Sequence, residues 1–469
     1  MEIIHVSAEC YPVAKTGGLA DVVGALPKYQ QQLGHIAKVV MPMHRMKFLY
    51  DHKWEVVHKG SFGMGWYNFD FTIIKESENS LEFDLYCVDI NGLLDREKVY
   101  GYDDDTERFV AFQIAVTEWI SKWEHKPDII HLHDHHTSLI PFMLKNCFVY
   151  NHISHIKTIL TIHNAQYQGW MGWEKATYLP GWDTWKWGLL DWQNLVNPLA
   201  CGIKCADRVT TVSPGYMQEL MNEANGLESL FRSESYKSIG IINGIDYSVW
   251  NPQTDTFIMD NYSHKDVKAG KELNKKKLCD DFKLDKKLPL IIFIGRLVQE
   301  KAADLLPDAI RLAFEKTKNK FSFLILGSGV KQIENALEEV QGDNSGFYNS
   351  QIGYNEKLSH QMYAGADFLL MPSRVEPCGL NQLYAMRYGT VPVVRKTGGL
   401  QDTVIDYEET DGYGITFLHA TTEDIVYSIE RAVHLYKNKK KLLEISGIMM
   451  QIKTSWEDSA SKYIEVYTK

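Results

Sequence analysis

The sequence predicts an α/β protein with two similar domains, each built on a mostly parallel sheet that helices cover on both faces. The length of 469 residues exceeds what one ordinary hydrophobic core accommodates, so two domains are expected. Strand-like apolar runs alternate with helical patterns along the chain, which is typical of doubly wound parallel sheets. The pentapeptide Lys15–Leu19 recurs at Lys396–Leu400, and this repeat indicates two related halves.

The predicted strands fall into two series, separated by the polar, lysine-rich stretch Asn251–Pro289 with a short helix around Val267–Leu278. The first series comprises Ile3–Val6, Ala37–Met41, Leu81–Val88, Asp128–His133, Thr158–His163, Arg208–Val212 and Gly240–Ile242. The second comprises Leu290–Ile294, Phe321–Leu326, Asp367–Met371, Val391–Val394 and Gly414–Phe417. We therefore expect one domain over residues 1–250 and another over 251–454. Residues 455–469 carry apolar side chains at helical spacing and predict a final amphipathic helix.

Composition and charge place the chain among ordinary globular proteins. Hydrophobic residues make up 45% of the sequence and charged residues 23%. The formal net charge of −10 argues against a nucleic-acid partner. No apolar run approaches the roughly 18 residues of a membrane-spanning helix, and the amino terminus carries no secretory pattern. The seven scattered cysteines fit a reducing cytoplasm better than a disulfide framework.

The first copy of the repeat, Lys15–Leu19, connects the predicted strand Ile3–Val6 to a helical pattern that runs from Leu19 to Leu33. Glycines in such a turn let the backbone approach a phosphate closely, and the free N–H groups at a helix start point toward it. Lys15 is expected to add a mobile positive charge. The turn therefore predicts a phosphate or nucleotide contact in the first domain.

Charged residues also follow two strands of the second domain. Arg296 and Lys301 come after the first of these strands, and their side chains suit a diphosphate. Glu376 and Gly379 come after the third, where the carboxylate could accept sugar hydroxyls and a helix start could hold a phosphate. Taken alone, the two cations could be ordinary surface charges and Glu376 a carboxylate that caps a helix.

A cluster of histidines stands at the end of the strand predicted at Asp128–His133. It consists of His131, His133, Asp134, His135 and His136. Three interpretations stay open: a metal site, an Asp134 that faces a sugar, and structural histidines with satisfied hydrogen bonds. The ligand spacing of metallo-hydrolases is not met. His163 and Asn164 occupy the equivalent place after the next predicted strand.

Six of the twelve tryptophans lie between Trp170 and Trp192, mixed with glycines and prolines. Such a segment is too broken to form one core helix. Flat aromatic rings on a loop suit stacking against sugars, and they also seal domain cores. Both interpretations stay open from the residues alone.

Five motifs together resemble the bacterial glycogen synthases and plant starch synthases, over nearly the whole chain. They are Lys15–Val22, Thr161–Asn164, Thr210–Pro214, Ile242–Asp246 and Glu376–Leu380. The resemblance implies two Rossmann-like lobes of the GT-B type with the site in the interlobe cleft, and a last helix that packs back on the first lobe. It further implies a retaining transferase that adds glucose from ADP-glucose to the non-reducing end of an α-1,4-glucan, without a metal or other cofactor.

The same resemblance implies a role for individual residues. The implied catalytic residues are Glu376, Lys301, Arg296, His163 and Asp134. The implied substrate-binding residues are Lys15, Gly17, Gly18, Asp21, Asn164, Asn243, Tyr354, Cys378, Gly379 and Leu380. Glu376 would stabilise an oxocarbenium-like transition state, the backbone carbonyl of His163 would face the anomeric carbon, and Tyr354 would stack on the base. Cations and helix starts would offset the charge of the leaving diphosphate.

Three departures from the family pattern bear on the substrates. His135 stands where the family has tryptophan, and Glu300 and Ala302 flank Lys301 where the family has glutamine and glycine. The tryptophan-rich segment replaces a stretch richer in phenylalanine and leucine. The alternatives are therefore UDP-glucose as donor, a short maltooligosaccharide as acceptor, or a catalytically weak glucan-binding protein.

Overall fold

The computed structural model describes residues 1–469, apart from the side chain of Asp343. The chain forms two compact units: Met1–Asn243 together with Trp456–Lys469 make the first unit, and Gly244–Ser455 make the second. The sequence placed this boundary at residue 250, a few residues beyond its position in the structure. Within the described residues, no helix is both long enough and apolar enough to cross a membrane.

The first unit is built on a nine-stranded sheet with the strand order β11-β10-β7-β6-β1-β2-β5-β4-β3. Its strands are β1 (Glu2–Val6), β2 (Ile36–Pro42), β3 (Trp54–Met64), β4 (Tyr67–Glu76), β5 (Asp84–Asp89), β6 (Ile129–His133), β7 (Lys157–Ile162), β10 (Arg208–Thr211) and β11 (Ser238–Gly240). All neighbours are parallel except the β3–β4 and β4–β5 pairs. This agrees with the predicted parallel sheet.

Two parts of the first sheet differ from the sequence prediction. The antiparallel hairpin β3–β4 was not predicted, because its residues are largely exposed and the hairpin contains no buried apolar run. The last strand was predicted at Gly240–Ile242, whereas β11 spans Ser238–Gly240. The alternation of the remaining strands with helices was predicted correctly.

Helices cover the sheet of the first unit. They are α1 (Gly18–Gln32), α2 (Lys47–Asp51), α3 (Asp105–Ser121), α4 (Ile140–Asn146), α5 (Pro198–Cys205), α6 (Pro214–Leu220), α7 (Glu228–Ser233) and α16 (Trp456–Thr468). The C-terminal helix α16 packs on α1, since Trp456, Tyr463 and Tyr467 are buried in one cluster with Val22 and Leu26. The last residues of the chain thereby complete the core of the first unit.

The second unit has a six-stranded, all-parallel sheet with the order β14-β13-β12-β15-β16-β17. The strands are β12 (Leu290–Ile294), β13 (Ser322–Gly327), β14 (Tyr348–Ile352), β15 (Phe368–Met371), β16 (Val391–Arg395) and β17 (Ile415–Phe417). The edge strand β14 was missed, because only one of its five residues is fully buried. In chain order this arrangement is 3-2-1-4-5-6, the Rossmann order.

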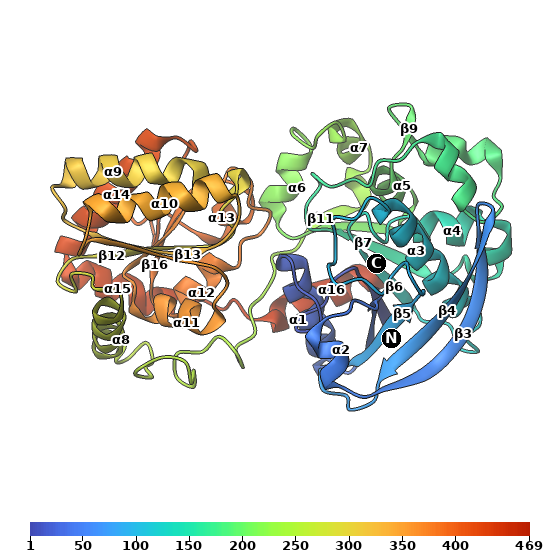
Figure 1. The fold of residues 1–469 in the computed structure, drawn as a ribbon, viewed down its shortest axis with the longest axis horizontal. Coiled ribbons are helices and arrows are strands. Elements are labelled where there is room, and N and C mark those ends of the chain that lie inside the picture. The colour runs from blue at the N-terminus through green and yellow to red at the C-terminus, as the bar shows by residue number, and fades with distance from the viewer. The chain divides into compact units, whose positions relative to one another are not determined.

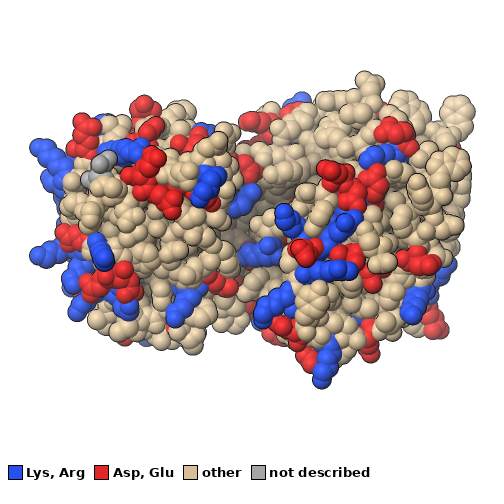
Figure 2. Space-filling view, viewed as in Figure 1, with Lys and Arg blue, Asp and Glu red and all other residues tan. Residues whose placement is uncertain are grey.

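Figure 1 shows that helices lie on both faces of the second sheet, with α9, α10 and α14 on one side and α8, α11, α12 and α15 on the other. Their bounds are α8 (Val267–Phe282), α9 (Leu306–Thr317), α10 (Lys331–Asp343), α11 (Glu356–Gly365), α12 (Asn381–Arg387), α13 (Gly398–Thr403), α14 (Thr422–Lys437) and α15 (Lys439–Met449). The short helix predicted around Val267–Leu278 is α8, about one turn longer than expected. Acidic and basic side chains are interspersed over the visible face of each unit (Figure 2).

Each sheet contains one place where the direction of winding reverses. In the first unit, β1 lies between β2 and β6, and in the second, β12 lies between β13 and β15. The chain moves outward to one side of the first strand and then returns to continue on the other side. In such sheets, ligands bind beyond the carboxyl ends of the strands at this switch point. The residues that follow β1, β6, β12 and β15 are therefore the ones to inspect.

Candidate active site

The switch point of the second unit carries a lysine–glutamate pair. Nζ of Lys301, after β12, donates to both carboxylate oxygens of Glu376, after β15, at 2.8 Å each. The hydroxyl of Ser373 donates to Oε2 of Glu376, also at 2.8 Å. The two charged side chains are only 21% and 10% exposed, so solvent screens the pair weakly. Two residues that the sequence placed in one site thus lie in direct contact.

Arg374 joins the loops that carry this pair, and sequence reasoning missed it. Its guanidinium binds the carboxylate of Asp304 through two hydrogen bonds, of 2.6 and 2.9 Å, and donates to the carbonyl of Gln299 at 2.6 Å. The backbone N–H of Arg374 donates to the carbonyl of Glu300 at 2.8 Å. Such a forked contact holds both loops in one geometry. Only the spatial proximity of two distant segments reveals it.

Arg296 pairs with Glu300 rather than with Glu376. It donates to the carboxylate of Glu300 at 2.8 Å, and its side chain is about half exposed. Ala302, which directly follows Lys301, is fully buried and has φ at 52°, in the left-handed region that favours glycine. This backbone conformation accounts for the glycine that the family pattern has at this position.

The turn Glu376–Leu380 is supported by the second copy of the repeat. The backbone N–H of Gly399 donates to the carbonyl of Glu376 at 3.1 Å. A Cβ on Gly398 or Gly399 would collide with the backbone of Glu376 or Cys378. Within the turn itself, Gly379 has φ at 72°, which only glycine adopts at low cost. Leu380 then caps the seven-residue helix α12, and Cys378 is buried.

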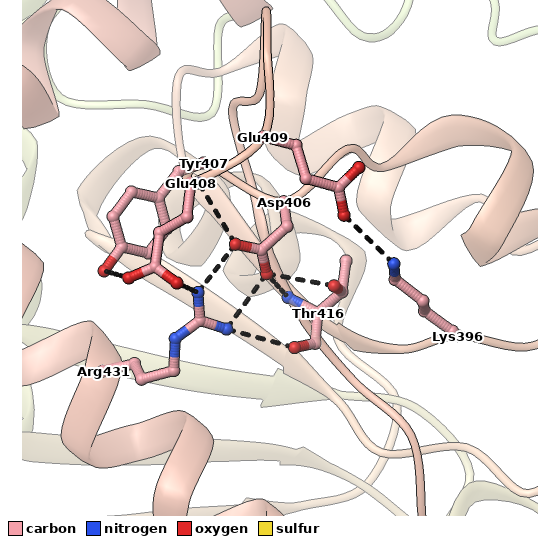
Figure 3. A network of polar contacts seen from close by, with 7 residues as sticks. All are labelled: Lys396, Asp406, Tyr407, Glu408, Glu409, Thr416 and Arg431. Atoms are coloured by element: carbon pink, nitrogen blue, oxygen red, sulfur yellow. Dashed lines mark hydrogen bonds and ion pairs between the residues drawn. The ribbon is translucent and has the colours of Figure 1, made fainter.

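The lysine of the second copy is held by an ionic network (Figure 3). Lys396 pairs with Glu409 at 3.2 Å. Asp406 lies in the same loop as Glu409, and Arg431 of α14 binds its carboxylate through two contacts of 2.7 and 3.0 Å. Asp406 also accepts the backbone N–H of Thr416 at 2.8 Å. These contacts fix the connection between β16 and β17. The second copy is therefore a structural element beneath the Glu376 turn.

The first copy, Lys15–Leu19, is held by Glu9, which sequence reasoning missed. The carboxylate of Glu9 accepts the backbone N–H groups of Thr16 and Gly17, and the hydroxyl of Tyr100 donates to it at 2.7 Å. Burial raises the pKa of Glu9. A single carboxylate directly after β1 is a weak signal in the sequence, because its partners are loop amides and a distant tyrosine.

Lys15 is not the unpaired, mobile charge that the sequence suggested. Its Nζ lies 2.7 Å from Oδ1 of Asp21, one turn into α1, and about a third of the lysine side chain is exposed. The correction has a simple cause: a lysine before a helix and an aspartate in its first turn are within reach of each other. Asp21 and Lys15 thus form one local pair at the start of α1.

Gly17 and Gly18 line open space. A Cβ on either glycine would have no described atom within 4 Å, and Gly17 has φ at −148°, an extended backbone that any residue adopts. Neither packing inside the unit nor backbone strain requires glycine here. This is the opposite of Gly398 and Gly399, and it leaves room for a ligand against the backbone.

The turn after β6 and the turn after β7 are joined through Asp134. Its Oδ1 accepts the backbone N–H of His163 at 2.7 Å and that of Asn164 at 3.4 Å. Asp134 has φ at 58°, and burial raises the pKa of its carboxyl to about 7. Oδ1 of Asn243, after β11, is buried and has no hydrogen-bond partner among the described residues.

The histidine cluster is mostly internal. His5, His131 and His133 could bring three ring nitrogens within 4.8 Å of one another, yet every ring nitrogen of the three already has a hydrogen-bond partner. A metal ion there would have to displace these bonds. His135 and His136 contact each other with ring centroids 3.7 Å apart. His131 and His133 are thus structural histidines with satisfied hydrogen bonds, whereas the buried Nδ1 atoms of His135 and His136 have no hydrogen-bond partner among the described residues.

The tryptophan-rich segment divides between core and surface. Trp182 packs edge-on against Phe142, and the indole N–H of Trp192 donates to the carbonyl of Gly226 at 2.9 Å. Trp185, by contrast, is 90% exposed and Trp187 is 55% exposed. Tyr354 in the second unit is also exposed, after the positive-φ residue Gly353. The core interpretation thus holds for part of the segment, and stacking of its exposed rings on sugars stays a prediction.

The chain contains two doubly wound sheets, with charged loops at the switch point of each. The sequence profile described as "Starch synthase catalytic domain" matches residues 2–233, and the profile "Glycosyl transferases group 1" matches residues 274–446. Together the fold and the profiles show that the chain is a glycosyltransferase of the GT-B type.

Similar proteins identify the family. The glycogen synthase of Flavobacterium johnsoniae is 53% identical over 467 residues, which cover 100% of this chain and 98% of that protein. The glycogen synthase of a Hydrogenobaculum species is 37% identical over 488 aligned positions, with 100% and 98% coverage. The catalytic domain of starch synthase IV from Arabidopsis thaliana, solved with ADP and acarbose, has a TM-score of 0.90 at 33% identity, with 100% and 98% coverage.

A more distant structure shares the fold alone. The sucrose-phosphate synthase of Thermosynechococcus elongatus has a TM-score of 0.64 at 17% identity, and the match covers 99% of this chain and 98% of that one. The chain belongs to the glycogen and starch synthase family. It is a glucosyltransferase that uses a nucleotide-sugar donor and a glucan acceptor.

Proposed function

We propose that this protein takes glucose from ADP-glucose and adds it to the non-reducing end of an α-1,4-glucan, with retention of configuration. The Lys301–Glu376 pair at the switch point of the second unit carries the proposal. A protein that only binds glucan has no need of a partly buried cation beside a carboxylate at the switch point of a Rossmann-like sheet. The ADP in the starch synthase IV structure supports an adenine nucleotide.

In the second unit, we assign Lys301 and Arg296 to the donor diphosphate. The ammonium group of Lys301 has three N–H donors, and Glu376 engages it through two oxygens, so a third donor can meet a phosphate oxygen. Arg296 is half exposed and offers the rest of its planar fork. Tyr354 presents an exposed ring for stacking on the base.

Glu376 acts on the transferred sugar in this proposal. Its carboxylate faces the positive charge that develops on the glucosyl group, while Lys301 and Ser373 fix its orientation. The backbone of Cys378, Gly379 and Leu380 holds the distal phosphate and sugar. No enzymic nucleophile is required if the leaving phosphate accepts the proton of the attacking hydroxyl on the same face.

In the first unit, the open backbone at Gly17 and Gly18 receives part of the donor, with Lys15 and Asp21 beside it. The carbonyl of His163 faces the anomeric carbon, and Asp134 holds that turn through the backbone N–H groups of His163 and Asn164. Asn243 offers its unpartnered side-chain oxygen to a substrate hydroxyl. All these roles concern substrate binding and orientation.

The decisive experiment measures transfer of labelled glucose from ADP-glucose and from UDP-glucose to glycogen and to maltooligosaccharides. We expect ADP-glucose with glycogen to give the highest kcat/KM. A higher kcat/KM with UDP-glucose would assign UDP-glucose as the donor, and a higher kcat/KM with short oligosaccharides would assign these as the acceptor. Glucan binding without transfer from either donor would refute the proposal.

We also propose that the protein works in the cytoplasm. All seven cysteines are free thiols and all are buried, although the pair Cys201 and Cys205 stands one helical turn apart on α5. Free thiols persist in reducing compartments. Tagging the protein in its native host and fractionating the cells would test this location.

A further inference from the structure

Eight buried side chains form one continuous chain of hydrogen bonds through the core of the first unit. In order they are His163, His133, His5, Gln30, Tyr467, His131, Thr161 and Thr210. The successive distances are 3.0, 3.1, 2.8, 2.9, 2.6, 2.6 and 2.5 Å. Every member is at most 8% exposed. The chain runs from the turn after β7 through α1 to the C-terminal helix and back.

The histidines in this chain are neutral, because burial lowers the pKa of His5 to about 4 and that of His163 to about 3. Burial also holds the pKa of His131 and His133 well below the usual value. A neutral imidazole has one N–H donor and one bare acceptor nitrogen. Consequently, fixing the donor on one nitrogen fixes the role of the other.

Gln30 decides the direction of the bonds, because its amide has an oxygen that only accepts and a nitrogen that only donates. Oε1 faces Nε2 of His5, so that nitrogen carries the proton and Nδ1 of His5 is an acceptor. Nε2 of His133 must then donate to His5, and Nδ1 of His133 must accept from Nε2 of His163. The proton of His163 is thereby held on Nε2.

The other half of the chain follows the same rule. Nε2 of Gln30 donates to the hydroxyl of Tyr467, which donates in turn to Nδ1 of His131. Nε2 of His131 donates to the hydroxyl of Thr161, which shares a hydrogen bond with the hydroxyl of Thr210. The bonds from His163 as far as Thr161 therefore all point away from His163, whose Nδ1 makes no hydrogen bond with any residue that the structure describes.

We propose that Gln30 is a positioning residue for His163: through His5 and His133 it leaves Nδ1 of His163 as a bare acceptor for a hydroxyl group of the substrate. The proposal rests on the role proposed above for the His163 turn. If the amide of Gln30 were reversed, every bond in the chain would reverse and Nδ1 would carry a proton. A buried residue in the last turn of α1 thus sets which partner His163 can bind.

The test uses the whole protein labelled with ¹⁵N in its histidine rings, where NMR separates protonated from bare nitrogens. The signals of His163 are those missing from the variant His163→Gln. In the wild type we expect a proton on Nε2 and none on Nδ1. Because this measurement needs no substrate, absence of transferase activity would refute the proposed function and leave the tautomer result standing.

The variant Gln30→Met keeps the length of the side chain and removes both the donor and the acceptor. We expect His163 to show both tautomers and kcat to fall about tenfold, as for the loss of one hydrogen bond in the transition state, with the KM for ADP-glucose nearly unchanged. The control Thr210→Val removes an equally buried bond at the opposite end of the chain. It should leave the tautomer of His163 and kcat as in the wild type.

Three outcomes would overturn the proposal. One is a wild-type His163 with its proton on Nδ1. Another is a folded Gln30→Met protein with unchanged tautomer and kcat. The third is an equal loss of kcat in Thr210→Val, which would indicate general damage to the core. If Gln30→Met does not fold, the wild-type tautomer alone decides.

Discussion

The two copies of the Lys-Thr-Gly-Gly-Leu repeat allow a controlled comparison inside one chain. Gly18 is the first residue of α1, and a Cβ there would meet no described atom within 4 Å. Alanine is favoured over glycine in a helix by about 1 kcal/mol, so Gly18→Ala should leave stability unchanged or raise it by up to that amount. Gly399 is different, because its Cβ would overlap the backbone of Cys378. Gly399→Ala should therefore cost about 1–3 kcal/mol of stability.

The effect on activity should run in the opposite direction. If the donor phosphate approaches the backbone at Gly18, a methyl group there weakens one or more charge-assisted hydrogen bonds, each worth about 1.5–3 kcal/mol. This predicts a loss in kcat/KM for ADP-glucose of roughly 10- to 100-fold in Gly18→Ala. Protein of the Gly399→Ala variant that remains folded should lose far less, unless the Glu376 turn moves with it.

The assay pairs calorimetry with initial rates of transfer from ADP-glucose to glycogen. The thermal midpoint of Gly18→Ala should equal or exceed that of the wild type, and the midpoint of Gly399→Ala should fall. A fully active Gly18→Ala enzyme would refute the assignment of this backbone to the donor. A Gly399→Ala protein as stable as the wild type would refute the packing argument for the second copy.

Three further predictions follow from the same structure. Lys301→Met should lower kcat by at least about a hundredfold, because the diphosphate would lose a positive charge. The control Lys331→Met alters an exposed lysine and should not change kcat. Equal activity of both variants would exclude Lys301 from the diphosphate contact. Trp185→Ala should weaken binding to glycogen by a fewfold, about 1 kcal/mol, without changing kcat on maltotriose, and unchanged binding would assign this exposed ring no glucan contact. The carboxyl pKa of Asp134 is about 7 in the folded protein and about 4 in the unfolded chain. Between about pH 4 and pH 7, the folded state therefore binds one more proton at Asp134 than the unfolded state does. Stability should therefore fall as pH rises from about 4 to 7, and calorimetry of Asp134→Asn should lack this part of the decline.

The α/β architecture could be predicted from the sequence, because buried parallel strands are short apolar runs with helical patterns between them. β12 and β15 illustrate this, as each is a run of buried aliphatic or aromatic residues. The hairpin β3–β4 was missed because an exposed antiparallel pair lacks such a run. Strand order could not be predicted either, since the pairing of β1 with β6 depends on contacts across more than a hundred residues.

For the candidate site, the sequence identified residues that directly follow strands and missed the residues that hold them. Lys301 and Glu376 were predicted together and lie 2.8 Å apart. Arg374 and Glu9 were not predicted, although one joins two loops and the other binds the N–H groups of the Lys15 turn. Their partners are backbone groups or residues distant in sequence, so nothing in the local pattern distinguishes them from surface charges.

The repeat shows most clearly what a sequence motif alone does not predict, namely the role of each copy. Both copies have the same five residues and lead into a helix, α1 or α13, but Lys396 directly follows β16 whereas β1 already ends at Val6, well before Lys15. The surroundings of each Cβ then separate their roles: Gly398 and Gly399 press against the Glu376 turn, while Gly17 and Gly18 face open space. The two lysines also have different partners. Lys396 pairs with Glu409 in the connection between β16 and β17, and Lys15 pairs with Asp21 in the first turn of α1. A shared motif thus does not specify a shared backbone, since Gly17 has φ at −148° and the equivalent Gly398 has φ at 44°. The space beside each backbone indicates which copy can receive a phosphate.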